Sequence, residues 1–137
     1  MTDGSITSTI SANIPEFLEK YVDGKTITFY KVNVTNNFSK QNWSLEKRYS
    51  EFEYLYKTLM KIVPNVPLIP GKSMFKVTAY DALTKRRLQL ESFIRDCTNR
   101  KDIISNDYFK SSLSWINILL KWHITPLLKF MSIVNCL

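Results

Sequence analysis

The spacing of the apolar residues changes near residue 50, and this change limits the fold more than any other feature of the chain. Before it, Tyr30, Val32 and Val34 alternate with polar residues, which is typical of a half-buried strand. After it, the apolar residues from Phe52 to Val63 recur at intervals of three and four, which is typical of a helix. A run of strands followed by a run of helices predicts an α+β fold.

Three strands are expected before this change. The segment Ile6–Ile14 is β-branched and rich in hydroxyl groups, and Pro15 should end or bend this edge strand. An Asp-Gly turn then leads into the alternating segment Thr26–Thr35. After a polar loop, Trp43–Tyr49 alternates again, with one face made of Trp43, Leu45, Lys47 and Tyr49. Together these segments predict a three-stranded antiparallel meander.

The first helix is expected to begin at a capping box and to end at a proline. In Ser50-Glu51-Phe52-Glu53, the Ser50 hydroxyl can accept a hydrogen bond from the backbone N–H of Glu53. The helix should run to about Val63 and stop at the following proline. The three residues Pro64, Pro67 and Pro70 recur at the period of polyproline II, so a proline-rich loop should follow this helix.

Two further helices are expected, over about Ala79 to Thr98 and over Asn106 to about Trp115. The buried stripe of the longer one is marked by Leu83, Leu90, Ile94 and Cys97. Arg86 and Arg87 follow Leu83 by three and four residues, so they should lie beside this stripe rather than opposite it.

The net charge is uneven along the chain. The chain has 19 Lys and Arg against 12 Asp and Glu, a formal charge of +7. The section from Lys40 to Arg87 holds most of the excess, with ten basic and four acidic residues. Such a cluster favours an anionic partner, whether nucleic acid, phospholipid or a phosphorylated ligand, although a solvated basic face is the simpler explanation.

Several classes of function are excluded by the composition. Two cysteines and one histidine allow neither a disulfide framework nor a cluster of metal ligands. The sequence offers no Ser/His/Asp or Cys/His arrangement and no glycine loop for phosphates, so we expect no enzyme and no cofactor. The N-terminal residues lack the basic start and apolar run of a signal peptide, and we expect a cytoplasmic protein.

The two ends of the chain are expected to differ from the middle. Residues 1–4 are expected to be a disordered start. Residues 114–137 are apolar and are expected to be helical, but Lys121, Pro126 and Lys129 make a membrane-spanning helix a poor fit. Two alternatives stay open for this segment: an amphipathic helix packed on the domain or on a partner, and an auxiliary anchor that lies on a membrane.

Four short elements have the chemistry of one anion site: Lys47-Arg48-Tyr49, the turn Pro67–Lys72, Arg86-Arg87 and the apolar pair Met74-Phe75. An arginine offers a planar fork of donors to a phosphate, and a lysine offers a point charge. A tyrosine ring offers a flat face to the axial C–H bonds of a sugar-like ring. Each element alone has an ordinary explanation as surface charge, core or loop.

The order of these elements resembles the phox-homology (PX) domain, and most closely that of the small sorting nexins. Three strands, Arg48-Tyr49-Ser50-Glu51-Phe52, a helix, the Pro67–Lys72 turn and a helix with Arg86–Ile94 follow one another. The resemblance covers about residues 5–113 and leaves residues 114–137 outside the family pattern. It implies a three-stranded antiparallel meander packed against a helical subdomain, with a proline-rich loop between the first two helices.

PX domains bind phosphoinositide headgroups, most often phosphatidylinositol 3-phosphate, and the resemblance implies a role for each matching residue. Arg48 would hold the 3-phosphate, with Ser50 adding a contact, and Tyr49 would stack beneath the inositol ring. Lys72 would meet the 1-phosphate, and Arg86 would reach the 4- and 5-hydroxyls. Arg87 is the alternative to Arg86 for this last role.

The resemblance also implies a peripheral protein on endosomal or vacuolar-type membranes, with a role in sorting or trafficking. Its membrane-insertion loop would consist of Met74, Phe75, Lys76 and Val77. The chain departs from the family pattern at Pro67-Leu68, where two adjacent prolines are frequent.

Two other kinds of partner were weighed on the sequence. An SH3-like module could bind the edge formed by Pro64, Pro67 and Pro70, which would make the protein an interaction scaffold. Nucleic acid could bind the basic middle section, but the chain has no RNA-stacking signature, and we expect no nucleic-acid partner.

Overall fold

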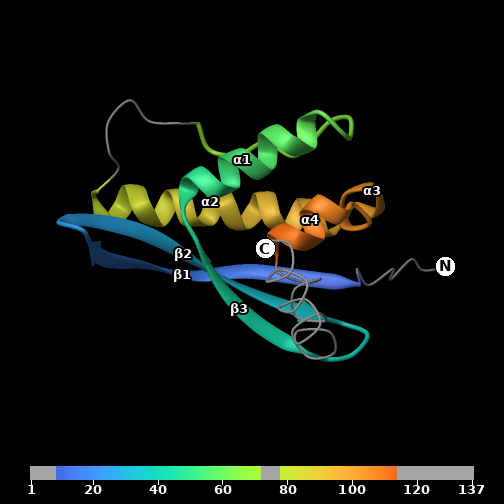
Figure 1. Cartoon of the computed structure of the whole chain (residues 1–137), viewed down its shortest axis with the longest axis horizontal. Helices are drawn as coiled ribbons and strands as arrows, with labels where there is room; N and C mark the ends of the chain where they lie inside the picture. The colour runs from blue at the N-terminus through green and yellow to red at the C-terminus, as the bar shows by residue number, and fades with distance from the viewer. Residues whose placement is uncertain (1–8, 72–77, 114–137) are drawn as a thin grey trace, which may run out of the picture.

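The computed structural model describes residues 9–71 and 78–113, which form an antiparallel sheet with helices on one side of it (Figure 1). The strand order is β1–β2–β3. In chain order the elements are β1 (Ile10–Val22), β2 (Lys25–Asn36), β3 (Asn42–Lys47), α1 (Tyr49–Met60), α2 (Tyr80–Thr98), α3 (Lys101–Ile104) and α4 (Asp107–Ser112). The predicted α+β fold with an antiparallel meander is confirmed.

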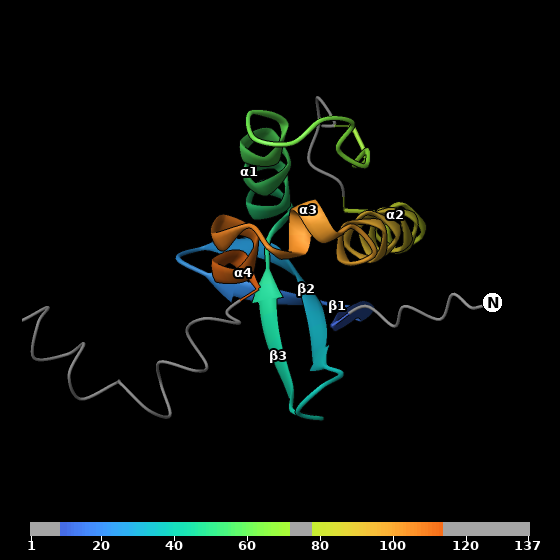
Figure 2. The same cartoon turned by 90° about the vertical axis from the view of Figure 1, so that its right-hand side faces the viewer.

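The central strand β2 supplies the middle of the buried sheet face. Its residues Tyr30, Val32 and Val34 are at most 1% exposed, while Lys31 and Asn33 between them face the other side. This is the alternation that the sequence predicted. The helices cover the buried face with apolar side chains, chiefly Phe52, Leu55 and Leu59 of α1 and Leu90, Phe93 and Ile94 of α2. Figure 2 shows the arrangement of the helices and the sheet after a turn of 90°.

Pro15 was predicted to end or bend the first strand, and the predicted end is wrong. β1 continues through Pro15, and its pairing with β2 shifts register between residues 13 and 16. At such a bulge the ladder needs no N–H from the proline. The backbone of Ile14 is instead held by α2: its N–H donates to the Glu91 carboxylate at 2.8 Å, and its C=O accepts from Arg87 at 2.6 Å. The strand lies at the edge of the sheet, as predicted.

Helix α1 begins and ends earlier than predicted. Its first residue is Tyr49, so β3 stops at Lys47, and its last residue is Met60 rather than Val63. The chain therefore leaves the helix before the first proline of the loop, and backbone hydrogen bonds of a short turn replace the last helical turn.

The capping box predicted at Ser50 and Glu53 is wrong. The helix is capped two residues earlier, where the Glu51 carboxylate accepts from the backbone N–H of Arg48 at 3.0 Å. A carboxylate near a helix N-terminus satisfies a free donor and interacts favourably with the helix dipole, so no serine cap is required.

The long helix α2 is confirmed with its buried stripe, because Leu83, Leu90, Ile94 and Cys97 are at most 1% exposed. The predicted third helix is shorter: α4 is capped by the Asn106 side chain, which accepts from the N–H of Phe109 at 3.1 Å. Helix α3, four residues long, was not predicted, since one turn has no periodicity. Within the described ranges, no helix has the length and apolar character needed to cross a bilayer.

Candidate functional site

Arg86 of α2 and Tyr49 of α1 meet at the centre of the candidate site. The guanidinium carbon of Arg86 lies 4.2 Å from the centroid of the Tyr49 ring. Tyr49 is placed there because it follows β3 directly and opens α1. The attraction of a cation for an aromatic face stabilises this arrangement. Two of the motifs singled out in the sequence are thus brought together.

The hydroxyl of Tyr49 ties the proline loop to this pair. It donates a hydrogen bond of 2.6 Å to the carbonyl of Pro70. Partial burial, and then the nearby Glu53 carboxylate, raise the pKa of Tyr49, against the opposing effect of Arg86. The hydroxyl therefore stays protonated at neutral pH and remains a donor to Pro70. The ring and the loop are held in fixed relation before any ligand arrives.

A second phenol lies beside Arg86. Burial raises the pKa of Tyr30, and the Arg86 guanidinium acts in the opposite direction. Tyr30 is 1% exposed, and Arg86 is near enough to act on its hydroxyl. The Arg86 guanidinium therefore lies against the Tyr49 ring and near Tyr30 of β2, which limits its freedom before a ligand binds.

The first turn of α1 adds further positive character. Arg48, the cap residue, is exposed, and within residues 9–71 and 78–113 its guanidinium has no ion-pair partner. Ser50 is also exposed, in the first turn, where the N–H groups of a helix favour an anion. Lys47 is nearly buried, and burial lowers its pKa against the opposing effect of Glu51, whose carboxylate lies 3.7 Å away.

A family model for the PX domain matches residues 35–114, more than half of the chain. The chain belongs to the PX domain family. It is 32% identical over 98 residues to the serine/threonine-protein kinase Sgk3 of Rattus norvegicus, a match that covers 70% of this chain and 19% of the kinase. It is 31% identical over 83 residues to a probable serine/threonine-protein kinase of Dictyostelium discoideum, covering 58% of this chain and 4% of that protein.

Solved PX domains have the same fold. A designed CISK-PX domain superimposes with a TM-score of 0.68 at 25% identity, covering 75% of this chain and 97% of that one. The mouse SNX19 PX domain with bound sulphate ion gives a TM-score of 0.57 at 21% identity, covering 77% and 96%. PX domains are generally non-catalytic modules that bind phosphoinositides and associate peripherally with membranes.

The PX fold separates the two adjacent arginines that the sequence left as alternatives. Arg86 lies on Tyr49, whereas Arg87 is turned to β1 and donates to the carbonyl of Ile14. Neighbouring residues of a helix point about 100° apart, so only one of them can face the ring. The partner of Arg87 lies far away in the sequence, so sequence reasoning could not tell them apart.

Sequence reasoning missed a third arginine that shapes the PX site. Arg100, which precedes α3, donates to the backbone carbonyls of Pro64 and Asn65 and pairs with Asp102. Asn65 has a φ of 51°, a left-handed conformation that asparagine tolerates. Arg100 thus fixes the start of the proline loop while Tyr49 fixes its end. Its spacing from the loop gives no sequence signal.

The remaining predicted residues of the PX site are Lys72, Met74, Phe75, Lys76 and Val77, and they lie outside the described residues. In the described part of the chain, no group of three or more His, Cys, Asp or Glu side chains could hold a metal ion.

Proposed function

We propose that this PX domain binds phosphatidylinositol 3-phosphate and brings the protein to endosomal or vacuolar-type membranes as a peripheral protein. The proposal rests chiefly on one observation: the Arg86 guanidinium lies 4.2 Å from the Tyr49 ring, and Arg48, the residue before Tyr49, is exposed. One guanidinium therefore lies against the aromatic face, and a second arginine precedes that ring in the chain. This combination suits a ring that carries both phosphates and hydroxyls.

In the proposed complex each residue has one role. Arg48 holds the 3-phosphate with a bidentate hydrogen bond, and Ser50 adds a contact at the start of α1. Arg86 donates to the 4- and 5-hydroxyls, and Tyr49 stacks beneath the ring. Lys72 neutralises the 1-phosphate. Support for Lys72 comes from its place in the chain, two residues after the Pro70 carbonyl that Tyr49 holds.

The loop after Lys72 is proposed to enter the membrane through Met74, Phe75 and Val77, with Lys76 at the surface. The described residues near this loop support the proposal, since Leu68 before it is 80% exposed and Tyr80 after it is 73% exposed. A buried Phe or Met contributes about 1.5–3 kcal/mol, and each basic residue near an anionic surface about 1 kcal/mol. Binding free energies of this size make membrane binding reversible, so a second membrane signal or avidity is expected.

Liposome flotation with each mono- and bisphosphorylated phosphoinositide tests the proposal. The wild type should float with liposomes that contain the 3-phosphate and should remain in solution with the 4- and 5-phosphate lipids. Arg48→Ala should abolish this binding while leaving the circular dichroism spectrum unchanged. Lys101→Ala, an exposed basic residue on α3, serves as the matched control and should bind normally. Binding that ignores the position of the phosphate would overturn the proposal.

An SH3-like partner at the proline loop is the second proposal from the sequence, and the contacts of the loop disfavour it. Pro67 and Pro70 are half-buried, and the carbonyls of Pro64 and Pro70 are bound by Arg100 and Tyr49. An aromatic-lined groove needs an accessible polyproline edge. For a nucleic-acid partner, the discriminating experiment is competition, because a soluble inositol headgroup should displace the lipid but not RNA.

A further inference from the structure

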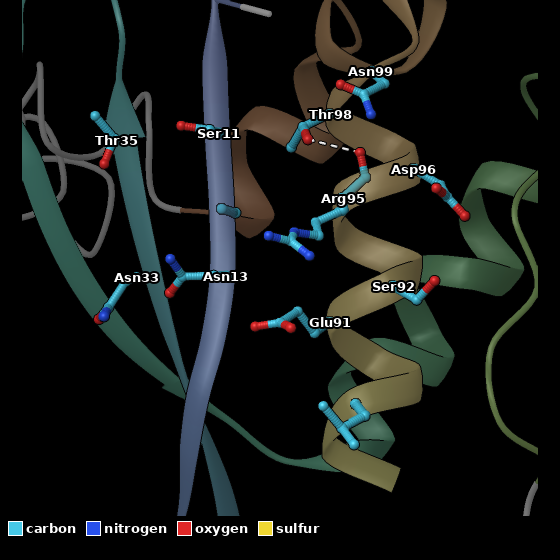
Figure 3. A pocket seen from close by; sticks show the side chains of 12 residues that line it. Ser11, Asn13, Asn33, Thr35, Glu91, Ser92, Arg95, Asp96, Thr98 and Asn99 are labelled. Atoms are coloured by element: carbon cyan, nitrogen blue, oxygen red, sulfur yellow. Dashed lines mark hydrogen bonds between the residues drawn. The ribbon is translucent and has the colours of Figure 1, made fainter. Parts of the chain in front are cut away.

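A polar groove of about 720 Å³ lies between β1 and α2, away from the Arg86–Tyr49 pair (Figure 3). Ser11, Ala12 and Asn13 of β1 form one wall, and Glu91 and Arg95 of α2 form the other. In the described part of the chain β1 is an edge strand, so its outer side has no neighbouring strand. The groove therefore runs along part of a sheet edge, at which Ala12 keeps 7% of its surface exposed.

The hydrogen-bond pattern of β1 shows which backbone groups face this groove. In an antiparallel pair, alternate residues direct their N–H and C=O to the partner strand. The C=O of Thr9 accepts from Asn37 at 2.8 Å, so Thr9, Ser11 and Asn13 face β2. Ala12 and Ile14 consequently face outward. The bonds of Ile14 to Arg87 and Glu91 agree with this alternation, which leaves Ala12 as the next outward residue.

A row of side chains on α2 follows the same edge. Arg87, Glu91 and Arg95 are four residues apart and share one helix face. One more turn advances about 6 Å along the helix from Glu91, and two residues advance about 7 Å along the strand from Ile14, so Arg95 comes level with Ala12. Figure 3 shows Glu91 and Arg95 pointing toward β1, while Ser92 and Asp96 point away from it.

Arg87 and Glu91 are hydrogen-bonded to the backbone of Ile14. The next residues along the groove, Arg95 and Ala12, differ from them. Within the described ranges, neither the Arg95 guanidinium nor the backbone of Ala12 has a hydrogen-bond or ion-pair partner. An unpaired strand edge is a template for another strand, and a free guanidinium is a fork for a carboxylate. Both occur at the same level of one groove.

We propose that this edge binds an extended peptide that carries a carboxylate. The peptide backbone pairs with the N–H and C=O of Ala12, and the carboxylate receives two hydrogen bonds from Arg95. Pairing stops at Ile14, where α2 side chains take the place of a strand, so only a few residues are bound and the affinity is modest. Of the charged residues that line the groove, Glu91 is bound by the N–H of Ile14 and Asp96 points away from β1, so Arg95 is the charge that faces the edge, and it favours a carboxylate.

The peptide site and the proposed lipid site are compatible. Arg86 and Arg95 are nine residues apart on α2, which corresponds to about 13 Å along the helix. A bound peptide at Ala12 therefore leaves the Tyr49 ring accessible, and the peptide proposal does not depend on which lipid is bound.

Titration of the ¹⁵N-labelled full chain with the acetylated pentapeptide Val-Glu-Val-Glu-Val tests the proposal by NMR. Saturable amide shifts are expected at Ser11–Asn13 and around Arg95. Arg95→Glu should weaken binding at least tenfold and should instead favour Val-Lys-Val-Lys-Val, whereas the matched charge reversal Lys101→Glu should change the affinity less than twofold. Val-Glu-Pro-Glu-Val should bind at least tenfold more weakly, because proline lacks the N–H that strand pairing needs.

Four outcomes would overturn the proposal. Absence of shifts on β1, equal affinity in Arg95→Glu, or equal affinity of the proline peptide each remove it. Concentration-dependent shifts on β1 without peptide, matched by dimers in sedimentation, assign the edge to a second copy of the chain. Binding of a soluble inositol headgroup by Arg95→Glu is measured in parallel, so failure of the lipid proposal and failure of the peptide proposal remain distinguishable.

Discussion

Alanine substitutions at Arg86 and Arg87 should give opposite results, although the two residues are adjacent. Arg87→Ala removes the 2.6 Å hydrogen bond to the carbonyl of Ile14 and leaves that acceptor without its partner beside a fully buried side chain. A hydrogen bond to a charged group contributes about 1.5–3 kcal/mol. Because this bond is only partly buried, we expect a loss near 2 kcal/mol, to the order of magnitude, in the free energy of unfolding.

Arg86→Ala should cost less stability and more binding. It removes the contact with the Tyr49 ring, which is worth about 0.5–1 kcal/mol where the cation is partly exposed. If Arg86 donates to the inositol hydroxyls, its loss leaves two hydrogen bonds unmade in the complex. At about 0.5–1.5 kcal/mol for each bond, the headgroup affinity should fall by about 5- to 150-fold.

Urea unfolding followed by circular dichroism and calorimetry with soluble inositol 1,3-bisphosphate measure the two effects separately. With a urea slope of about 2 kcal/mol/M, Arg87→Ala should lower the midpoint by about 1 M, while its folded fraction binds the headgroup within about threefold of the wild type. Arg86→Ala should change the urea midpoint less than Arg87→Ala does and should weaken headgroup binding more. The reasoning is refuted if Arg87→Ala keeps its midpoint and loses the headgroup, or if Arg86→Ala is the less stable of the two.

Three further predictions follow from the structure. Arg100→Gln should leave the helical circular dichroism unchanged but weaken headgroup binding several-fold in calorimetry, because the start of the proline loop loses its anchor; unchanged affinity would mean that the loop does not need it. Burial lowers the pKa of Lys47 below 10.5, so the unfolded chain binds more protons just below that pH and the wild type should gain stability there as pH rises. Lys47→Met should lack this gain in urea midpoints measured at pH 8, 9 and 10, and identical pH profiles would contradict it. Burial raises the pKa of the Cys97 thiol to about 12, so in a Cys136→Ser background it should react with a thiol reagent at pH 8 far more slowly than in urea, and equal rates would show that the site is open.

The parts of the fold that the sequence predicts correctly depend on local periodicity. Tyr30, Val32 and Val34 alternate because β2 has one buried face, and the stripe from Leu83 to Cys97 repeats because α2 has another. The errors occur where a distant residue decides a local outcome. A proline in a strand predicts an end or a bend at Pro15, and nothing near it in the sequence shows that Glu91 and Arg87 hold the preceding residue so that the strand continues.

The helix start at Tyr49 shows the same limit at the candidate site. Ser50 is a good capping residue by type, but the N–H of Arg48 is satisfied by Glu51, and this moves the start of the helix toward β3. As a result Tyr49 belongs to the helix instead of the strand. A pattern of residue types identifies Arg48 and Tyr49 as a motif. Their orientation depends on which side chain accepts from the backbone N–H at the start of the helix, and here it is Glu51.

The different roles of Arg86 and Arg87 also depend on contacts with residues far away in the sequence. Both backbone groups of Ile14 point away from β2, and α2 satisfies them with residues one turn apart, which fixes the rotation of the helix about its axis. Once Arg87 is committed to Ile14, the residue before it must point toward Tyr49. A change at Glu91 should therefore act on stability as Arg87→Ala does, because the remaining bond still holds α2 against Ile14. Glu91→Gln keeps the shape and a hydrogen-bond acceptor, so it should preserve the urea midpoint where Glu91→Ala lowers it, with headgroup affinity of the folded fraction within about threefold in both; equal midpoints in the two variants would show that the bond from Ile14 to Glu91 does not stabilise the fold.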